Sequence, residues 1–411
     1  MIAVTVDEAL HLWNEALREQ HHSIESIAVG DAKGCVLAED VLAPTDVPAF
    51  HKSAMDGYAL AYEPNCDTYI VDGIIGAGVV WDKPVTSGHA VRIMTGAPVP
   101  STCDTVIMQE QVQGSGEIGS TITIQGHQQK GSHIIPRGEE CSAGTVVIPK
   151  GTEVTSTVQT ILTGLGHIAV SVYAMPRILV LTSGHEVIEP GEPLAAGKIY
   201  NSNRMMICSL LDDLGFRRVT HYHVSDASDK LDLEIARVLE LGEQADIIIS
   251  SGGVSVGMFD TMPLIYEKLG AKTLYERIQM RPGAASYGAV TPKGQLIFGL
   301  SGNPGAAFNG WHLLVVPTLR RYKGIKNWST PVLNCVMDCD LSKRNAFDRY
   351  VQGKVIFGDG QPRFVANRHF NSSSMLGLYT VNALACIPQG VHEVHEGDIF
   401  KVYLLGILPT I

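Results

Sequence analysis

The sequence predicts a multi-domain protein in which a doubly wound α/β domain is flanked by small β domains. Strand-like and helix-like segments alternate from residue 176 to about 322, which is typical of β-α-β units around a parallel sheet. Residues 51–136 are instead rich in Gly, Thr, Val and Ile, with frequent turn signals, a pattern of small all-β domains. Strand-like segments return after residue 326. A length of 411 residues is enough for several domains.

The N-terminal part contains two predicted helices separated by extended pieces and the all-β segment. Val6–Glu19 has apolar residues at helical spacing and is predicted to be an amphipathic helix. Residues 26–45 read as short extended pieces, and an apolar helix is predicted near Ser156–Leu165.

The α/β segment begins at Pro176 with a continuous apolar run. Such runs are typical of strands that are buried on both faces of a parallel sheet. The predicted strands cover 177–183, 218–224, 245–250 and 294–300, and the predicted helices cover 202–215, 229–242, Met262–Lys268 and Ala306–Leu319. A strand-like segment, YERIQM, is also expected at 275–280.

These segments divide the chain by type. Residues 50–136 are a predicted small β domain, and residues 1–49 and 137–175 have mixed character. Residues 176–325 are the predicted α/β domain, and residues 326–411 are a predicted C-terminal β domain.

Three loops of small residues follow three predicted strands. Ligands of open α/β sheets bind outside the carboxyl ends of the strands, and Gly-rich loops there direct backbone N–H groups at anions. A lone loop of this kind is usually only a tight connection, whereas three could line one site. The candidate binding residues are Thr182, Ser183, Gly184, Ser251, Gly252, Gly253, Ser301, Gly302, Asn303 and Pro304.

Three carboxylates near these loops are candidate metal ligands. Glu186 and Asp260 follow two of the loops, and Asp226 follows the strand at 218–224. Mg²⁺ prefers oxygen ligands and binds through one or two carboxylates and a phosphate. The alternatives are a solvated loop acid for Glu186 and a helix N-cap for Asp226. Arg281 could hold a phosphate with its forked donors, or could be a surface arginine at a turn.

Composition excludes several classes of protein. A net charge of −11 argues against a broad nucleic-acid interface. No apolar run is long enough to span a membrane, no signal peptide is evident, and the eight cysteines are scattered without CxxC, so a reduced, cytoplasmic protein is expected. The chain has no Walker A or G-x-S-x-G motif, which disfavours standard P-loop hydrolysis and serine catalysis.

A series of motifs resembles the molybdopterin molybdenumtransferase (MoeA) family, which includes the E domain of gephyrin. The motifs occur in family order over nearly the whole chain: SAMDGYA at 53–59, IMTGAPVP at 93–100, MQE at 108–110, PRGEECSAG at 136–144, TSGHE at 182–186, IYNSNR at 199–204, SSGGVSVG at 250–257 with Asp260, RPG at 281–283, SGNP at 301–304 and NSSSMLGLYTVNALACIPQG at 371–390.

This resemblance implies an elongated homodimer of four-domain subunits. Domain I is then the mixed α/β, dimer-forming part made of residues 1–49 with 137–175, and domain II is the small β domain of residues 50–136. Domain III, residues 176–325, is the molybdopterin-binding α/β domain shared with molybdopterin adenylyltransferases, and domain IV is the β domain of residues 326–411. The implied reaction inserts molybdate into adenylylated molybdopterin and releases AMP, with Mg²⁺ as the metal. Adenylyltransferases and molybdoenzyme maturation proteins are the implied partners. By position, Glu186, Asp226 and Asp260 match acidic residues around metal and substrate, and Asp56 and Thr95 match functional positions that the other subunit would supply.

Several positions depart from the family pattern. Glu140 and Asn201 stand where the family usually has Asp, Ala284 replaces a basic residue, and Ser301 replaces a proline. Losing the cation at 284 removes a charge that could bind molybdate or phosphate. A divergent paralogue that binds molybdopterin or a partner protein without efficient turnover is therefore the second hypothesis. An adenylyltransferase is the third, and the additional β domains speak against it.

Overall fold

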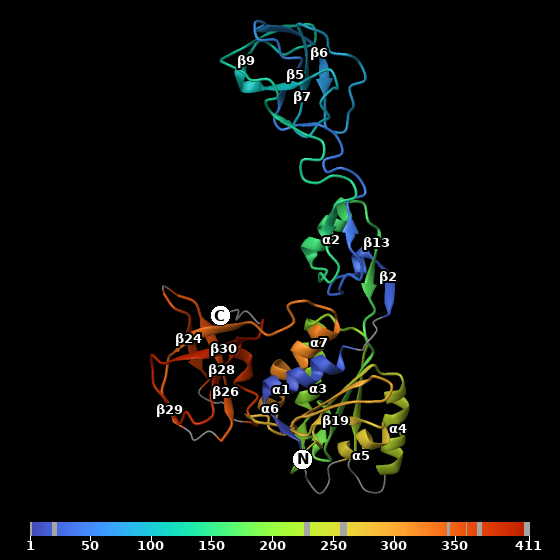
Figure 1. Ribbon diagram of the computed structural model, residues 1–411, viewed down its shortest axis with the longest axis vertical. Coiled ribbons are helices and arrows are strands. Elements are labelled where there is room, and N and C mark those ends of the chain that lie inside the picture. The colour runs from blue at the N-terminus through green and yellow to red at the C-terminus, as the bar shows by residue number, and fades with distance from the viewer. Residues whose placement is uncertain are drawn as a thin grey trace. The chain divides into compact units, whose positions relative to one another are not determined.

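The computed structural model places the chain in two compact units (Figure 1). Unit 1 contains residues 1–38, 151–159 and 169–411, and unit 2 contains residues 39–150 and 160–168. The structure describes residues 2–18, 23–225, 231–254, 261–342, 346–358, 360–367 and 372–406.

A six-stranded sheet forms the centre of the α/β domain, in the order β17-β14-β18-β23-β22-β19. The first four strands are parallel, as expected for a doubly wound domain, whereas β22 and β19 continue the sheet antiparallel. The strands span Ile178–Ser183 (β14), Val219–Val224 (β17), Ile247–Ser251 (β18), Lys272–Tyr275 (β19), Tyr287–Val290 (β22) and Leu296–Leu300 (β23).

Alternate residues of the central strands build two separate cores. Ile247 and Ile249 of β18 pack into one core, and Ile248 packs into the other. Because successive side chains of a strand point to opposite faces, a strand covered on both sides must be apolar throughout. Every residue of β14, β18 and β23 is indeed buried, so the prediction of strands with two buried faces is confirmed.

Helices cover both faces of this sheet (Figure 1). The first core includes residues of α1, α3 and the last helical stretch, and the second includes residues of α4 and α5. The last stretch, predicted as one helix, contains a π-helical segment, η3, between two α-helices. The helices span Val6–Ala16 (α1), Ser202–Asp213 (α3), Leu231–Glu243 (α4), Met262–Lys268 (α5), Pro304–Gly310 (α6), Trp311–Val315 (η3) and Val316–Tyr322 (α7).

The chain between β19 and β22 differs from the single strand expected at 275–280. Arg277–Ile278 (β20) pairs with Ala3–Val4 (β1), and Met280–Arg281 (β21) pairs with β26 of the C-terminal domain. Two short strands thus leave the central sheet and join other parts of unit 1. Apolar pattern alone does not identify such partners, because pairing depends on segments that are distant in sequence.

The C-terminal domain is a five-stranded barrel, which agrees with the expected β domain. The order β26-β27-β24-β30-β28 closes because β28 also pairs with β26. Its core contains Cys335, Val351 and Phe364. The barrel strands span Val332–Met337 (β24), Asp348–Ile356 (β26), Arg363–Ala366 (β27), Ala383–Ile387 (β28) and Ile399–Leu404 (β30).

Unit 2 contains the predicted all-β segment as a second six-stranded sheet, in the order β8-β5-β7-β6-β10-β9. Its strands span Gly57–Leu60 (β5), Thr68–Ile75 (β6), His89–Ile93 (β7), Thr105–Met108 (β8), Val112–Gln113 (β9) and Thr121–Ile124 (β10). The short strands Val41–Leu42 (β3) and Val146–Ile148 (β12) also pair within unit 2.

The remaining secondary-structure predictions for the N-terminal part are confirmed with small shifts in the bounds. α1 begins with a capping box between Thr5 and Glu8 and ends at Ala16 rather than at residue 19. The second predicted helix is α2 (Ser156–Gly164), and the division between the two units falls within it. Ile24–Ala28 (β2) pairs with Ala169–Tyr173 (β13) inside unit 1. Among the described residues, no helix is both long and apolar enough to cross a membrane.

Candidate functional site

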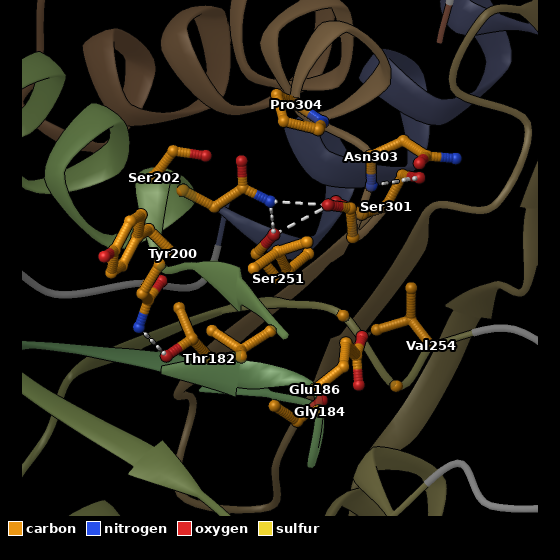
Figure 2. Close-up of a pocket in the computed structure, with 18 of the residues that line it drawn as sticks. Thr182, Gly184, Glu186, Tyr200, Ser202, Ser251, Val254, Ser301, Asn303 and Pro304 are labelled. Atoms are coloured by element: carbon orange, nitrogen blue, oxygen red, sulfur yellow. Dashed lines mark hydrogen bonds between the residues drawn. The ribbon is translucent and has the colours of Figure 1, made fainter. Parts of the chain in front are cut away.

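The three small-residue loops lie together at the carboxyl ends of β14, β18 and β23. They enclose a pocket of about 520 Å³ (Figure 2). Because these strands are parallel neighbours, their carboxyl ends meet at one edge of the sheet. The predicted residues that line the pocket are Thr182, Ser183, Gly184, Glu186, Ser251, Gly252, Gly253, Ser301, Gly302, Asn303 and Pro304.

Glycine allows the loops to approach one another closely. Gly252 has a φ of +90°, and a Cβ built on it would lie 2.8 Å from the backbone oxygen of Ser183. A Cβ on Gly302 would lie 3.3 Å from the Cα of Gly252. A side chain at either position would force the loops apart, and at Gly252 it would also be strained by the backbone conformation. These residues therefore give the pocket a wall of backbone.

The first turn of α3 joins the three loops and was missed as a site by the sequence analysis. Asn203 donates from Nδ2 to Ser251 Oγ at 2.8 Å and to the Gly302 oxygen at 2.8 Å, and Ser251 Oγ donates to the Ser301 oxygen at 3.0 Å (Figure 2). Asn201 donates from Nδ2 to Thr182 Oγ1 at 3.0 Å. One helix end thus contacts every loop of the pocket.

Asn201 also caps α3 and binds a carboxylate. Its Oδ1 accepts from the backbone N–H of Arg204, and its Nδ2 donates to Glu189 Oε1 at 3.0 Å. Arg204 Nη1 donates to Glu189 Oε2 at 2.5 Å. Burial would raise the pKa of Glu189, but the hydrogen bonds from Asn201 and Arg204 outweigh it and hold the pKa below its ordinary value. An amide suits this position because it donates to two oxygens and accepts from the helix.

Two histidines lie behind Thr182. Its Oγ1 is 3.0 Å from His221 Nε2 and 3.1 Å from His223 Nδ1. The hydroxyl has one proton and already accepts from Asn201, so at most one imidazole can accept that proton, and the other can hydrogen-bond only by donating its own N–H to the oxygen. Burial, aided by the positive charge of Arg204, lowers the pKa of His221 to about 4. His221 is therefore neutral near pH 7 and supports Thr182 as a neutral hydrogen-bonding partner.

Two buried polar atoms of the pocket lining have no hydrogen-bond partner among the described residues. They are Ser183 Oγ and Asn203 Oδ1. Buried polar atoms are normally paired, so both indicate contacts with a ligand or water. The amide oxygen accepts and the hydroxyl can donate. No Lys or Arg is present among the described residues of the lining. The pocket therefore offers neutral donors and acceptors to a polar ligand.

Glu186 is the only one of the three candidate metal ligands that lies in the described part of the chain. Its carboxylate is half exposed at the pocket and lies 3.7 Å from His185 Nδ1. Asp226 and Asp260 lie outside the described residues, so the predicted triad remains a prediction. Across the described residues, no cluster of three or more His, Cys, Asp or Glu is arranged to hold a metal ion.

Arg281 does not line the pocket. It is exposed on β21 and pairs in register with Arg349 of β26. Ala285, four residues further along the chain, does line the pocket. The structure thus brings this segment to the site through a small apolar side chain rather than through the predicted guanidinium.

Asp56 and Thr95 form a pair within unit 2. Asp56 Oδ1 accepts from the backbone N–H and from the hydroxyl of Thr95, each at 2.7 Å. These two hydrogen bonds hold the pKa of Asp56 below its ordinary value. Sequence analysis selected both residues, and the structure shows that they contact each other.

Comparison with known proteins gives matches over most of the chain. Residues 4–166 match the family model described as the MoeA N-terminal region (domain I and II). Residues 179–321 match a probable molybdopterin binding domain, and residues 334–405 match the MoeA C-terminal region (domain IV). All residues of the pocket lining lie within the second match.

Two similar curated proteins are both named molybdopterin molybdenumtransferase. The protein from Bacillus subtilis (strain 168) is 35% identical over 408 residues, which cover 95% of this chain and 93% of that protein. One from Staphylococcus epidermidis (strain RP62A) is 33% identical, covering 98% and 95%. In fold, the chain is similar to the crystal structure of the molybdopterin biosynthesis moeA protein from Pyrococcus horikoshii OT3, with a TM-score of 0.80, 24% identity and coverage of 98% and 100%.

Proposed function

Because this chain belongs to the MoeA family of molybdopterin molybdenumtransferases, we propose that its α/β pocket binds adenylylated molybdopterin and inserts molybdate into it with release of AMP. The protein accordingly acts in molybdenum cofactor biosynthesis. The observation that carries the proposal is the three-loop pocket, with its two unpartnered buried atoms, inside the probable molybdopterin binding domain. A pterin nucleotide has both polar ring edges and phosphates to pair with such a lining.

The loops and α3 would bind different parts of this substrate. The hydroxyl of Ser183, whose oxygen has no partner among the described residues, suits a phosphate oxygen, which only accepts hydrogen bonds. The backbone N–H of Gly252 already donates to the Leu300 oxygen at 3.2 Å, so it is not counted among these donors. Asn203 Oδ1 only accepts, so it suits an N–H group of a heterocycle rather than a phosphate. Asn303 and Pro304, at the start of α6, would lie near molybdate.

We also propose that a divalent cation binds at this lining together with the substrate. Because the described lining has no Lys or Arg, a bound diphosphate would have no cationic side chain there to neutralise it. The half-exposed carboxylate of Glu186 is a suitable oxygen ligand, and Asp226 and Asp260 would complete the set. When bound, Mg²⁺ would neutralise the diphosphate and favour cleavage of its anhydride bond.

Cleavage and insertion would then proceed with the phosphates held by the loops. A water molecule adds to the adenylyl phosphorus, the phosphoanhydride P–O bond breaks, and AMP leaves with the water oxygen, while the other phosphate stays on molybdopterin and the released proton passes to solvent. In the insertion, the two dithiolene sulfurs of molybdopterin bond to molybdenum, and one molybdate oxygen leaves as water with the two thiol protons, so the molybdenum keeps its oxidation state. Donors already aimed at the phosphates stabilise the charge that develops on them. We also propose that the Asp56–Thr95 pair and Arg281 support the reaction from outside the pocket lining. We expect the protein to be a cytoplasmic homodimer. It would receive its substrate from an adenylyltransferase and deliver its product to molybdoenzyme maturation proteins.

The test is release of AMP by the purified protein from adenylylated molybdopterin, molybdate and Mg²⁺. We expect AMP and molybdenum cofactor in equal amounts, and loss of both on chelation of the divalent metal. A curated relative assayed in parallel verifies the substrate. No AMP from this chain under conditions where the relative works would reject the proposal.

A second candidate function is binding of molybdopterin without efficient turnover. It is favoured by the absence of a cation from the described lining and by the small side chain of Ala285 at the pocket. Under this alternative, adenylylated molybdopterin would bind tightly and AMP would not appear. Normal turnover that is lost in Asn203→Ala would exclude it.

A further inference from the structure

A second pocket lies at the amino ends of the parallel strands, away from the substrate pocket. It has a volume of about 330 Å³ and is lined by Arg177, Arg217 and Arg218. Arg177 directly precedes β14, and the other two precede β17. Because β14 and β17 are adjacent and parallel, their amino ends lie side by side, so the three arginines line one opening.

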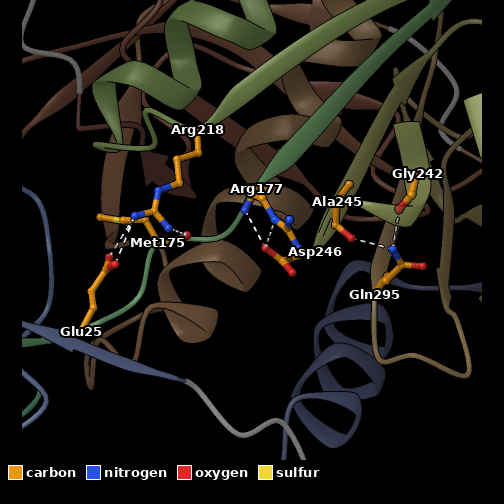
Figure 3. Close-up of polar contacts among 8 residues, drawn as sticks. All are labelled: Glu25, Met175, Arg177, Arg218, Gly242, Ala245, Asp246 and Gln295. Carbon is orange, nitrogen blue, oxygen red and sulfur yellow. Dashed lines mark hydrogen bonds and ion pairs between the residues drawn. The ribbon is translucent and has the colours of Figure 1, made fainter. Parts of the chain in front are cut away.

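Two of these arginines have carboxylate partners that use only part of their donors (Figure 3). Arg218 Nη2 is 3.1 Å from Glu25 Oε2, and its Nη1 donates to the Met175 oxygen at 3.3 Å. Arg177 Nε is 3.6 Å from Asp246 Oδ2, an oxygen that already accepts the backbone N–H of Arg177 at 2.7 Å. A guanidinium has five N–H donors, so both keep donors for another oxyanion.

Arg217 has no hydrogen-bond or ion-pair partner among the described residues. The described lining of this pocket also contains no Asp or Glu. Three arginines around an opening without a lining carboxylate make a local positive field on a chain whose net charge is −11. Among the described residues, Arg217 therefore adds a charge to this opening that no ion pair of the protein uses.

The other residues of this pocket form apolar walls and a turn that is held by hydrogen bonds. Leu179, Val219 and Leu241 contribute to the lining. Gln295 donates from Nε2 to the oxygens of Gly242 and Ala245, which holds the turn at the pocket's edge (Figure 3). Cationic and apolar surfaces therefore face the same opening.

We propose that this arginine pocket, formed by Arg177, Arg217, Arg218 and the apolar walls beside them, binds a small phosphate monoester at a site separate from the substrate pocket. The forked donors of arginine match phosphate oxygens, and the apolar side chains contact the organic group of the ester. The site uses the amino end of the sheet, whereas the molybdopterin pocket uses the carboxyl end.

The test measures binding of phenyl phosphate to the full-length protein by isothermal titration calorimetry, with inorganic phosphate as the comparison. We expect saturable binding of phenyl phosphate that is tighter than that of phosphate, because only the ester reaches the apolar walls. Arg217→Ala should raise the dissociation constant about ten- to a hundredfold, the effect of losing one charge-assisted hydrogen-bonding group. Arg217→Lys, which keeps the charge and loses the fork, should have an intermediate effect.

Arg237→Ala is the matched control, because Arg237 is a surface arginine of α4 that pairs with Glu240 and does not line the pocket. It should leave binding unchanged. Circular dichroism and thermal unfolding of each variant confirm that the fold is intact. Absence of binding to the wild type, or equal binding to the wild type and to Arg177→Ala and Arg217→Ala, would overturn the proposal.

Phosphate esters could also enter the substrate pocket, so Asn203→Ala is titrated as well. Binding that is lost in Asn203→Ala and kept in Arg217→Ala would assign the ester to the substrate pocket and overturn the inference. The AMP-release assay on the same preparations tests the proposed function independently. The two assays therefore show separately whether the arginine pocket binds the ester and whether the protein releases AMP, so that either proposal can fail while the other stands.

Discussion

The two ends of the parallel strands in the α/β domain bear opposite kinds of polar surface. At the carboxyl end, Asn203, Ser183 and Ser251 are buried, and no cationic side chain lies among the described residues of the lining. At the amino end, the polar lining is dominated by arginines, and Arg177 and Arg218 are more than half exposed. Six-residue strands such as β14 separate the two ends by about 20 Å.

The difference shows two ways of recognising an anion. Binding by neutral, buried groups depends on geometry, because each hydrogen bond needs a well-directed donor and acceptor. These groups carry no charge, so a metal ion can supply the positive charge that the anion needs. Binding by exposed arginines depends on their charge and tolerates small displacements of the ligand, but salt screens the attraction between the charges. Changes in shape should therefore damage the carboxyl end most, and changes in charge or salt should affect the amino end most.

The largest effect is expected from Gly252→Ala. A Cβ there would lie 2.8 Å from the Ser183 oxygen, so two of the loops must separate. Misplacing binding groups by about 1 Å can cost about a hundredfold in rate, and we expect a loss of that order in AMP release.

Gly294→Ala is the control for backbone strain. Gly294 has a φ of +81°, close to that of Gly252, but a Cβ added to it would have no other atom within 4 Å. Backbone strain should cost each variant about 1–2 kcal/mol of stability in urea titrations, Gly252→Ala should lose more because of the close contact, and only Gly252→Ala should lose activity. Equal activities would show that close approach of the loops is not required.

Asn203→Ala should have the next largest effect. It removes both hydrogen bonds that join α3 to Ser251 and Gly302, and leaves the buried Ser251 hydroxyl without its donor. We expect the free energy of unfolding to fall by about 1–3 kcal/mol and AMP release to fall at least about tenfold.

The matched variant is Asn303→Ala, because Asn303 precedes α6 without a side-chain capping bond. Its free energy of unfolding should stay within about 0.5 kcal/mol of the wild type. Similar losses of stability in both variants would contradict the role given to Asn203.

A smaller, pH-dependent effect is expected from His221. Its pKa is lowered to about 4 in the folded protein, so between pH 6.5 and 4 the unfolded chain binds the proton more readily than the folded one. The free energy of unfolding should therefore fall as the pH falls through this window, and be least affected by this group above pH 6.5.

Urea titrations of the wild type and of His221→Gln at several pH values measure this effect. Full burial would give at most the one-proton slope of about 1.4 kcal/mol per pH unit, and the half-buried ring should contribute only a fraction of it. The variant should have a flatter pH profile. Parallel pH profiles of the wild type and the variant would show that the neutral imidazole of His221 does not contribute to the pH dependence of stability.

The smallest effect is expected from Glu25→Gln at the amino end. The Glu25–Arg218 pair is partly exposed, and such pairs contribute less than about 1 kcal/mol. Urea titrations at low and high salt should differ for the wild type by more than for the variant. A fall of several kcal/mol in the free energy of unfolding would mean that the Glu25–Arg218 pair is an important structural contact, which would contradict its description as a partly exposed ion pair.

The sequence predicted the three loops well because each signal is local. An apolar run followed by small residues identifies a strand and the loop at its end, and parallel order then brings the loops together. Asn201 and Asn203 were missed because their contacts are with residues far along the chain. A polar Asn-Ser-Asn at a helix start indicates an N-cap, but gives no sign that Asn203 reaches Gly302.

The segment around Arg281 was less predictable for a related reason. Its alternating pattern fits a strand, yet β20 and β21 each pair with a strand outside the domain's main sheet. Which partner a short strand selects depends on tertiary packing, so the exposure of Arg281 could not be read from its neighbours. The four-domain division stays a prediction, since compactness alone separates the chain into two units.

The contact between Asn203 and Gly302 also has a consequence for protein synthesis. These residues are 99 positions apart, and the third loop follows β23, the last parallel strand of the sheet to be made. A nascent chain that has reached residue 254 carries two of the loops and the first turn of α3, but lacks the acceptor that joins them to the third. Since domains generally fold as units during translation, the ribosome would complete this pocket only when the α/β domain itself is complete. Ligand binding by stalled nascent chains would thus appear abruptly with chain length rather than loop by loop.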